Sequence, residues 1–399
     1  MSANAYERAL ARDALSQAWK DIFAKSSSAS RKTVGSDDIS INDFEVNSKS
    51  LWGTLGREVQ SRKFRFLPLR PYLIPKSNGK DRLVCVPTVR DRIVQRALVD
   101  YLSQKYRHHL ANKVSYGFIK GRSVKEAATN ACQLRAKKQW IFKTDITAFF
   151  DNINREALAT GLKKVVRESS LHGILTGALS CEVARSSKGT ERRIEALGIR
   201  RGLGVRQGMP LSPLFSNVML LPFDQEIQKQ GISAIRYADD LIFFASSKEE
   251  CQEIFAFCEI ELAKLKLAIP PVGPGSKSVI YEPDEPADFL GLELAGKKAG
   301  RYELKLSSKQ IQRIREEILQ YAAIPELLAR KVTLKNLGQI LTNKRNGYLA
   351  AYDVCENVLE VQKSLADVEQ KVLRNLYTNG LQIDLSALSR DAKTFLGLT

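Results

Sequence analysis

The chain contains 399 residues, more than one hydrophobic core usually supports, so two or three packed subdomains are expected. Its 62 Lys+Arg against 44 Asp+Glu give a net charge of +18, which indicates a polyanionic partner such as nucleic acid, with a merely soluble basic protein as the alternative. The 44% hydrophobic and 27% charged residues exclude wholesale disorder.

The cysteine and histidine patterns argue against zinc sites and a disulfide framework. None of the six cysteines forms a C-x-x-C pair, and none of the three histidines belongs to an H-E-x-x-H pattern. Residues 1–19 lack the apolar core of a signal peptide, and no run of eighteen apolar residues occurs. We therefore expect a cytoplasmic protein without a membrane partner.

The first part of the chain predicts a helix, a basic hairpin and a second helix. Residues 5–24 place apolar side chains at helical spacing, and a serine-rich loop follows them. Residues 65–86 contain two β-rich runs around SNGK at 77–80, where Asn-Gly is typical of a hairpin turn. Residues 89–110 repeat apolar positions at i, i+3 and i+4, which predicts a helix.

The middle of the chain predicts a strand that leads into helices and a long loop. Residues 140–153 begin as a β-rich run and end in acidic and aromatic residues, and residues 155–178 return to helical spacing. Residues 185–205 are basic and Gly-rich, which predicts a loop. Residues 206–227 run from a polar turn into a helix.

The remaining elements include a second hairpin with acidic residues at its tip. Residues 232–246 place apolar β-formers on both sides of a sharp polar break, which predicts two strands joined by a tight turn. A helix is expected over 248–267, another hairpin over 287–306, and mainly helix over 307–378.

Three aspartates are the candidates for catalytic chemistry. Asp145 ends the predicted strand, and Asp239 and Asp240 lie at the hairpin tip. Phosphoryl transfer to a 3′-hydroxyl uses two divalent metals about 4 Å apart, and Mg²⁺ prefers carboxylate oxygens. Taken singly, Asp145 has an alternative role as a helix N-cap, and the Tyr-Ala-Asp-Asp segment has one as a solvated turn.

Six sequence blocks occur around these aspartates in a fixed order. They are LIPK with GKDRLVCVPTVRDRIVQRAL (73–98), YGFIKGRS (116–123), KTDITAFFDNI (143–153), LGVRQGMPLSPLFSNVML (203–220), RYADDLIFFA (236–245) and FLGLEL (289–294). In this set the chain resembles the reverse transcriptase family, closest to its group II intron-like bacterial branch, over roughly residues 36–355.

The resemblance implies an α+β right-hand polymerase fold with fingers, a palm built on an antiparallel sheet, and a helical thumb. It places an N-terminal helical extension at 1–35, fingers at 36–144, a palm with an interleaved fingers segment and primer grip at 145–302, and the thumb at 303–399. The implied activity is RNA-directed DNA polymerase. Its expected partners are an RNA template, a DNA primer or product and dNTPs.

The resemblance also assigns metal and nucleotide ligands. Asp145, Asp239 and Asp240 would hold two Mg²⁺ ions, for which Mn²⁺ is a possible substitute, with the Ile146 carbonyl as a further ligand. Phe150 matches the steric gate that collides with a ribose 2′-hydroxyl, whereas plain core packing is the alternative for this phenylalanine. The residues assigned to nucleotide binding are Lys76, Lys80, Arg82, Phe150, Gln207, Gly208 and Lys277.

Several of these assignments have simpler alternatives. The basic residues of the first hairpin could form a solvated face, and Lys277 is one lysine in a Pro/Gly-rich loop. Residues 331–358 resemble the thumb of the family, where basic side chains would grip a duplex backbone, but a solvated helix face explains them equally. Residues 185–206 could clamp template or a bound RNA on the basis of composition alone.

Departures from family patterns favour a free-standing bacterial enzyme. No cysteine-pair endonuclease segment follows residue 355, and residues 130–134 lack the histidine of the retron Asn-Ala-x-x-His signature. The RQGMP segment at 206–210 differs from the motif of diversity-generating enzymes. By elimination, we expect an antiphage defence-associated reverse transcriptase that uses a structured noncoding RNA, with a CRISPR-linked or intron-derived enzyme as the alternative.

Two other functions compete with this interpretation. RNA-dependent RNA synthesis shares the metal chemistry but would require a small or polar residue in place of Phe150. A catalytically idle nucleic-acid-binding protein would be expected to lack part of the carboxylate set, whereas all three aspartates are present.

Overall fold

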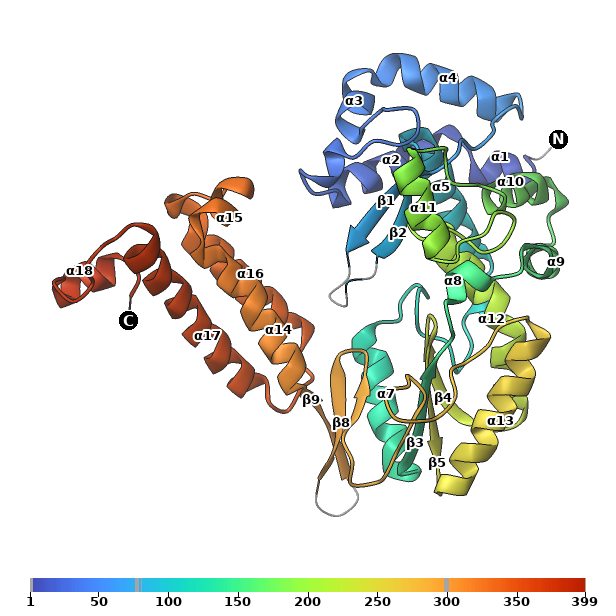
Figure 1. Ribbon diagram of the computed structural model, residues 1–399. Coiled ribbons are helices and arrows are strands. Elements are labelled where there is room, and N and C mark those ends of the chain that lie inside the picture. The colour runs from blue at the N-terminus through green and yellow to red at the C-terminus, as the bar shows by residue number, and fades with distance from the viewer. Residues whose placement is uncertain (1–2, 76–78, 80, 298–300, 399) are drawn as a thin grey trace. The chain divides into compact units, whose positions relative to one another are not determined.

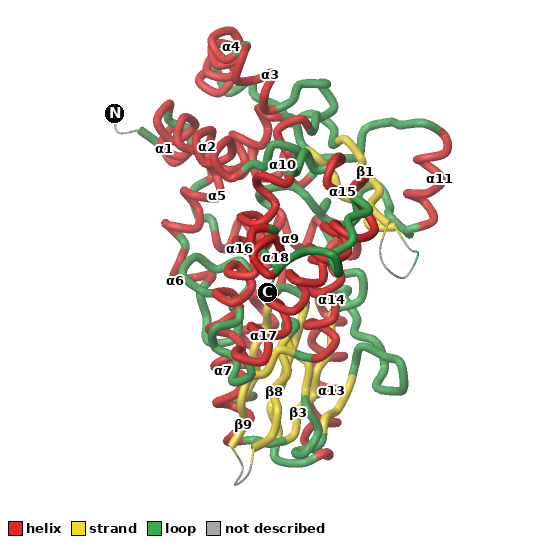
Figure 2. Tube along the Cα trace, turned by 90° about the vertical axis from the view of Figure 1, so that its left-hand side faces the viewer, coloured by secondary structure: helices red, strands yellow, loops and turns green. Residues whose placement is uncertain are grey.

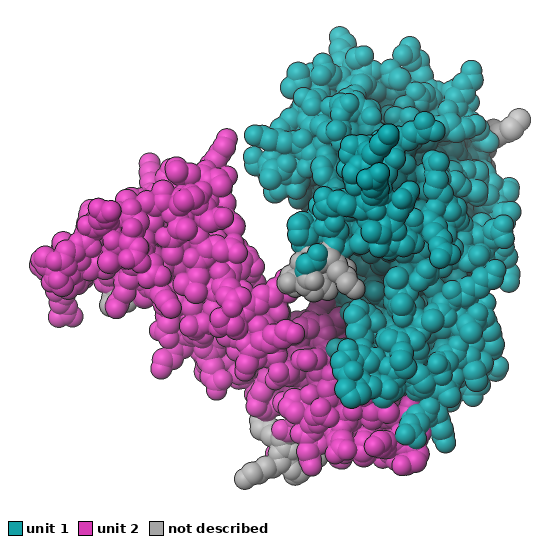
Figure 3. Space-filling model, viewed as in Figure 1, with its two compact units in different colours: residues 1–122, 143–243, 252–279 teal, residues 123–142, 244–251, 280–399 magenta. Residues whose placement is uncertain are grey.

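The computed structural model describes residues 3–75, 79, 81–297 and 301–398, which form helices and three short sheets (Figures 1 and 2). The chain divides into two compact units, drawn in different colours in Figure 3. The first comprises residues 1–122, 143–243 and 252–279, and the second comprises 123–142, 244–251 and 280–399. The predicted division into fingers, palm and thumb at residues 35, 144 and 302 stays a prediction.

The strands form three sheets of two, four and three members. The two-stranded sheet pairs β1 (Arg70–Pro75) with β2 (Asp81–Val86) in antiparallel register. The four-stranded sheet has the order β4 (Ser233–Tyr237), β5 (Asp240–Ala245), β3 (Trp140–Asp145) and β6 (Val279–Tyr281). The three-stranded sheet consists of β7 (Ala287–Phe289), β8 (Leu292–Lys297) and β9 (Arg301–Leu306), with antiparallel pairing throughout.

The first unit is mainly helical and contains the two-stranded sheet and most of the four-stranded sheet. Its helices are α1 (Ala5–Ala9), α2 (Arg12–Lys25), α3 (Ile41–Val46), α4 (Ser48–Gln60), α5 (Val89–Lys105), α6 (Arg107–Leu110), α8 (Phe149–Asn152), α9 (Arg155–Val165), α10 (Ser169–Leu179), α11 (Lys188–Ala196) and α12 (Ser212–Lys229), with one 3-10 turn, η1 (Ser30–Lys32). Helix α13 (Lys248–Lys264) follows β5, and residues 248–251 at its start belong to the second unit. Helix α12 is buried along most of its length, including Phe215, Val218 and Phe223.

The second unit contains a helical bundle after the three-stranded sheet. Its helices are α7 (Val124–Lys137), α14 (Ser308–Leu319), α15 (Ile324–Ala329), α16 (Leu334–Ala351), α17 (Val358–Asn375) and α18 (Arg390–Phe395), with η2 (Gln320–Ala322) and the π-helical turn η3 (Leu376–Gly380). Helices α14, α16 and α17 lie side by side (Figure 1). Helix α17 buries Val361, Leu365, Val368 and Val372, a spacing that places all four on one face.

Most predicted elements are confirmed, including the acidic hairpin of residues 232–246 and the strand pairing of the basic hairpin of residues 65–86. The Asn-Gly turn predicted for the basic hairpin lies outside the described residues except for Gly79. The helices predicted over 89–110, 248–267 and 307–378 are present with small shifts of their ends and with breaks between successive helices. Helices together with antiparallel hairpins confirm the α+β class. Among the described helices, none combines the length and apolar character that a membrane span requires.

Residues 185–205 are a correction, because this predicted loop contains helix α11. The Ser187 side chain accepts a hydrogen bond from the Thr190 amide and caps the helix, and Glu191 lies in the first turn, where its charge complements the helix dipole. Gly189 and Gly198 led the composition to predict a loop, although the residues between them are mostly good helix formers.

Two other boundaries differ from the prediction. The single helix expected at 5–24 is broken after α1, because Ala11 has an extended backbone, with ψ 152°. The hairpin expected at 287–306 is a three-stranded meander. Leu290 and Gly291, both with positive φ, form the tight turn between β7 and β8, and such turns match the twist of antiparallel strands.

Candidate active site

Three aspartates meet where β3 ends and where β4 turns into β5. Asp145 is the last residue of β3, Asp239 lies in the two-residue turn, and Asp240 begins β5. The Ile146 amide donates a hydrogen bond of 3.2 Å to the Asp239 carbonyl, which ties the end of β3 to the turn. The turn requires left-handed backbone at Ala238, where φ is 59°. The prediction that the acids lie at a hairpin tip is therefore confirmed.

The electrostatics of the turn show carboxylates that repel one another. Burial raises the pKa of Asp239, and the charge of Asp145 raises it further. Burial is also the largest cause of the raised pKa of Asp240, and the charges of Asp239 and Asp145 raise this pKa further. Lys143 on β3 lowers the pKa of Asp240 and opposes this effect. A bound cation would relieve the same repulsion.

Lys277 lies against the first aspartate. Its ammonium forms an ion pair with one carboxylate oxygen of Asp145, and its charge lowers the pKa of both Asp239 and Asp240. The next residue, Ser278, is buried and its hydroxyl lies 2.7 Å from that of Thr144, which fixes the loop beside β3. The structure therefore brings Lys277 to the aspartates, although its side chain remains 73% exposed.

The donor set fits a divalent cation in its chemistry. The charges of Asp145, Asp239 and Asp240 act on one another, and carboxylate oxygens suit Mg²⁺ or Mn²⁺. In the described part of the chain, however, no three acidic, histidine or cysteine side chains converge closely enough to form a complete ligand cluster. The Asp145 carboxylate is instead paired with Lys277, so a metal would have to displace this ammonium.

The two phenylalanines after Asp145 have different environments. Phe149 is 2% exposed, whereas Phe150 is only partly buried, and their ring centroids lie 5.2 Å apart. Core packing therefore accounts for Phe149, whereas Phe150 keeps part of its surface accessible. The Phe150 carbonyl accepts a hydrogen bond of 2.7 Å from the Val205 amide, which anchors its backbone to the segment before α12. Its assignment as a steric gate stays a prediction.

The basic hairpin and the Gln-Gly turn are joined through Cys85. The Cys85 amide donates to the Gln207 carbonyl at 2.7 Å, and a methyl group added to Gly208 would lie 2.3 Å from the Cys85 carbonyl oxygen. Arg82 is exposed on the same strand, β2, and its charge lowers the pKa of Asp239. Arg82 thus acts electrostatically on Asp239, whereas Gln207 and Gly208 are joined to the strand that carries Arg82. Lys76 and Lys80 lie outside the described residues.

The basic segment 185–206 contains one arginine with a structural role. Arg206 is 2% exposed, and it donates to the Arg200 carbonyl at 2.6 Å and to the Glu182 carboxylate at 3.3 Å. The same carboxylate accepts a bond of 2.7 Å from Arg155. Arg206 therefore holds the loop before α12, and a role of the segment in clamping RNA stays a prediction.

Sequence reasoning missed a buried polar network beneath the turn. Arg236 on β4 is fully buried and contacts Asp224 and Asn217, both on α12. One signal in the sequence could have revealed it. Arg236 lies two residues after the buried Ala234, on the same face of β4, so a charged residue occupies a position where a core residue is expected.

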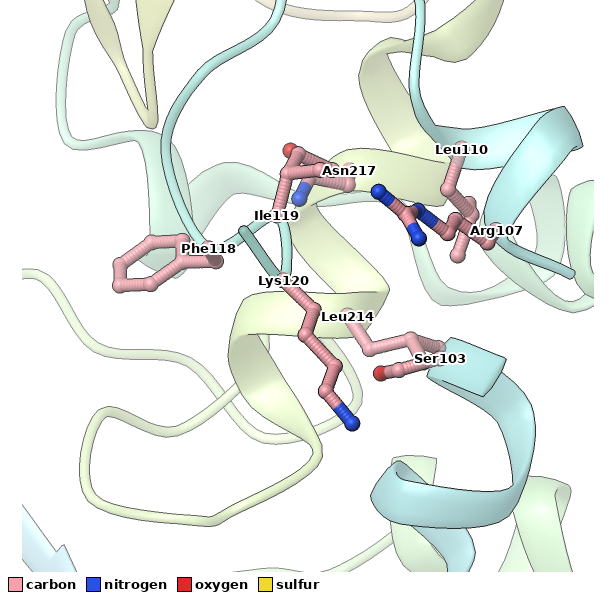
Figure 4. Close-up of a pocket in the computed structure, with 8 residues that line it drawn as sticks. All are labelled: Ser103, Arg107, Leu110, Phe118, Ile119, Lys120, Leu214 and Asn217. Carbon is pink, nitrogen blue, oxygen red and sulfur yellow. The ribbon is translucent and has the colours of Figure 1, made fainter. Parts of the chain in front are cut away.

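A strained aromatic residue lies next to this network. Phe118 has φ 61°, is 51% exposed, and its ring centroid is 6.5 Å from that of Tyr237. Its ring points away from Arg107, on the far side of a pocket of about 20 Å³ (Figure 4). The pocket is lined by Ser103, Arg107, Leu110, Phe118, Ile119, Lys120, Leu214 and Asn217.

Comparison with known proteins gives a family match over the region just described. Residues 74–294, more than half of the chain, match the family described as reverse transcriptase (RNA-dependent DNA polymerase). This span contains the three aspartates and every residue assigned to nucleotide binding.

The individual relatives match this chain at low sequence identity. Protein YkfC of Escherichia coli strain K12 is 30% identical over 218 residues, which cover 52% of this chain and 53% of that protein. The retron Ec83 reverse transcriptase of Escherichia coli is 26% identical over 184 residues, which cover 45% and 53%. The chain thus spans about half the length of these relatives. A solved structure of apo telomerase from Candida tropicalis, truncated from its C-terminal domain, aligns with a TM-score of 0.41 at 17% identity, covering 65% of this chain and 60% of that one.

Proposed function

Since this chain belongs to the reverse transcriptase family, we propose that it is an RNA-directed DNA polymerase that extends a primer along an RNA template by two-metal phosphoryl transfer. The family match and the α+β architecture confirm the predicted right-hand polymerase fold class. The observation that carries the proposal is the meeting of Asp145 with Asp239 and Asp240, joined through the Ile146 amide.

The aspartates have the chemistry that this reaction requires. Asp145, Asp239 and Asp240 would hold Mg²⁺, with Mn²⁺ as a substitute, and the Ile146 carbonyl is a candidate additional ligand. Bound divalent ions would lower the pKa of the attacking 3′-hydroxyl and neutralise charge on the leaving pyrophosphate. Lys277 would exchange its partner from Asp145 to the phosphates of the nucleotide when the carboxylates take up metal.

The remaining residues would select and orient the nucleotide. Arg82 offers a planar fork of donors to phosphate oxygens, and Lys76 and Lys80 offer point charges. Gln207 and Gly208 would lie along the nucleotide and the templating base. Phe150 is partly accessible, and its ring would collide with a ribose 2′-hydroxyl, so dNTPs are the expected substrates.

We also infer a dedicated structured RNA as the template and antiphage defence as the biological role. The net charge of +18 supports an RNA partner, because basic side chains gain affinity by releasing phosphate counterions. The defence role rests on the absent retron and diversity-generating signatures. Phage plaque counts on cells with and without the gene test it, and equal counts for a panel of phages would contradict it.

The test of the polymerase proposal uses the protein purified with its bound RNA. The RNA is sequenced, and labelled dNTPs or rNTPs are supplied with Mg²⁺. We expect DNA from dNTPs, and we expect the variants Asp239→Asn and Asp240→Asn to lose about 100-fold or more of the rate, since each removes a metal-binding charge. Asp367→Asn removes an equal charge at an exposed position of α17 and serves as the matched control.

The outcomes separate the competing functions. Incorporation of rNTPs at the same rate would indicate RNA synthesis and would contradict the role of Phe150. Bound RNA without incorporation of either nucleotide set would indicate a binding protein. Equal activity of the aspartate variants and the Asp367→Asn control would sink the assignment of the catalytic site.

A further inference from the structure

A buried guanidinium contacts the backbone of the aspartate turn directly. Arg236 is fully buried, and its Nη1 donates to the Ala238 carbonyl at 3.0 Å, one residue before Asp239. The same nitrogen donates to Asn217 Oδ1 at 3.1 Å. Nε and Nη2 form a bidentate pair with the Asp224 carboxylate, with distances of 2.7 and 2.5 Å. All three guanidinium nitrogens are therefore in use.

The partners of this guanidinium are themselves fixed. Asp224 is fully buried and also accepts a bond of 2.8 Å from the Asn112 amide group. The Asn112 carbonyl oxygen of the side chain accepts from the amides of Val114 and Ser115, at 2.8 and 2.7 Å. The network thus connects helix α12 with the segment before Phe118. Buried ions require this degree of satisfaction, because an unpaired buried charge is costly.

The segment before Phe118 also packs closely against the turn that carries Asp239. A methyl group added to Gly117 would lie 2.3 Å from the Ala238 nitrogen, so only a glycine permits this approach. The Gly117 carbonyl accepts a bond of 3.0 Å from Asn217, the residue that also binds Arg236. Ala238 is therefore held at its carbonyl by Arg236 and bounded at its amide by Gly117.

The turn needs such support because its conformation is unfavourable by itself. Ala238 has a φ of 59°, a left-handed backbone that alanine rarely adopts, and such residues persist where the surrounding structure holds them. The carboxylates of Asp239 and Asp240, which are neighbours in the chain, add charge repulsion to this backbone cost. Both effects favour relaxation of the turn away from a metal-binding arrangement.

We propose that Arg236, paired with Asp224, is a positioning residue that holds Ala238 in its left-handed conformation and thereby presents Asp239 and Asp240 for divalent cation binding. This inference rests on the proposed function, because it assumes that the aspartates bind metal. It goes beyond that function in assigning the metal affinity of the site partly to a buried ion pair that touches neither metal nor substrate.

The variant Arg236→Lys tests the inference. Lysine keeps the positive charge for Asp224, but its three N–H donors diverge from one nitrogen and cannot reproduce the four hydrogen bonds that the planar fork of Arg236 makes. The matched control is Arg135→Lys in the second unit, where an equally buried arginine donates to the carbonyls of Leu294 and Glu285, each at 2.6 Å. Both variants lose backbone hydrogen bonds from a buried guanidinium, so their melting temperatures should both fall.

The decisive readout is Mn²⁺ binding to the full-length protein, measured by electron paramagnetic resonance in the absence of nucleotide and template. We expect Arg236→Lys to weaken Mn²⁺ binding by about tenfold, the effect of losing one good hydrogen bond, and Arg135→Lys to stay within about twofold of wild type. Asp239→Asn identifies the site under observation. Equal affinities for both arginine variants, whether weakened or unchanged, would overturn the positioning role.

A second measurement separates this inference from the proposed function. The Ile146 amide donates a hydrogen bond to the Asp239 carbonyl, so its hydrogen-exchange rate measures how stably the turn is held. This measurement requires no bound metal. Faster exchange in Arg236→Lys than in Arg135→Lys supports positioning. If wild-type protein binds no Mn²⁺, the proposed function fails, and the exchange comparison alone then decides the role of Arg236, with equal rates counting against it.

Discussion

Replacing Gly117 with alanine should damage catalysis by displacing the aspartate turn. The added methyl carbon would lie 2.3 Å from the Ala238 nitrogen and 3.0 Å from the Tyr237 carbonyl carbon. Carbon atoms in proteins normally approach other heavy atoms to about 3.5 Å, so the turn or the Gly117 segment must move by roughly 1 Å. Both groups that would have to move are backbone, and no flexible side chain can absorb the contact.

The size of the effect follows from the tolerance of catalytic geometry. Functional groups must usually be held within about 0.5 Å, and a displacement of about 1 Å costs on the order of 100-fold in rate. We therefore expect kcat of primer extension to fall by about 100-fold, measured with saturating dNTP and Mg²⁺. The dNTP KM should change less, because Arg82 and Gln207 lie on other segments.

The control is Gly173→Ala on helix α10, where an added methyl group meets no atom within 4 Å. This variant should keep wild-type kcat, and its melting temperature should stay the same or rise, because alanine favours helix over glycine. A kcat for Gly117→Ala within about threefold of that for Gly173→Ala, with both proteins folded, would refute the reasoning.

Three further predictions concern the nucleotide site and the core. Phe150→Ala should raise rNTP incorporation relative to dNTP by at least about tenfold in competition assays, because it removes the ring expected to strike the 2′-hydroxyl; an unchanged ratio would assign the ring to packing. Gly208→Ala should raise the dNTP KM in steady-state extension, since the methyl group would lie 2.3 Å from the Cys85 carbonyl at a φ of 109°; a wild-type KM would count against contact of this turn with the nucleotide. Burial raises the pKa of Asp91 to about 6, so the folded state binds its proton more tightly and the unfolding free energy falls as pH rises from about 4 to about 6. In urea titrations at several pH values, Asp91→Asn should reduce this pH-dependent loss of unfolding free energy by about 3 kcal/mol. An unfolding free energy that depends on pH as in the wild type would contradict the raised pKa of Asp91.

The sequence was sufficient for the acidic residues and for the elements that carry them. Asp145 follows a β-rich run, and Asp239 and Asp240 interrupt two such runs, so alternation and turn chemistry alone predicted their positions. The basic hairpin was predicted in the same way. These signals are local, because they depend only on residues that are close together in the sequence.

Some local signals were present and were misread. Helix α11 was hidden by the glycines at 189 and 198, although Ser187 begins a standard helix cap. The break between α1 and α2 has no comparable signal, because Ala11 is a good helix former that nevertheless adopts an extended backbone. Tertiary packing decides such cases, since Leu10 and Leu15 on either side are both buried.

Only the tertiary structure decided which polar residues support the aspartates. Arg236 and Asp224 are twelve residues apart, and Asn112 is more than a hundred residues from both, yet their side chains form one buried network. The close approach of Gly117 to Ala238 also joins distant segments. Sequence patterns report which face of an element is buried, but not what it meets there. The chemistry of the site was therefore determined by the sequence, and its geometry by contacts between segments that the chain brings together only on folding.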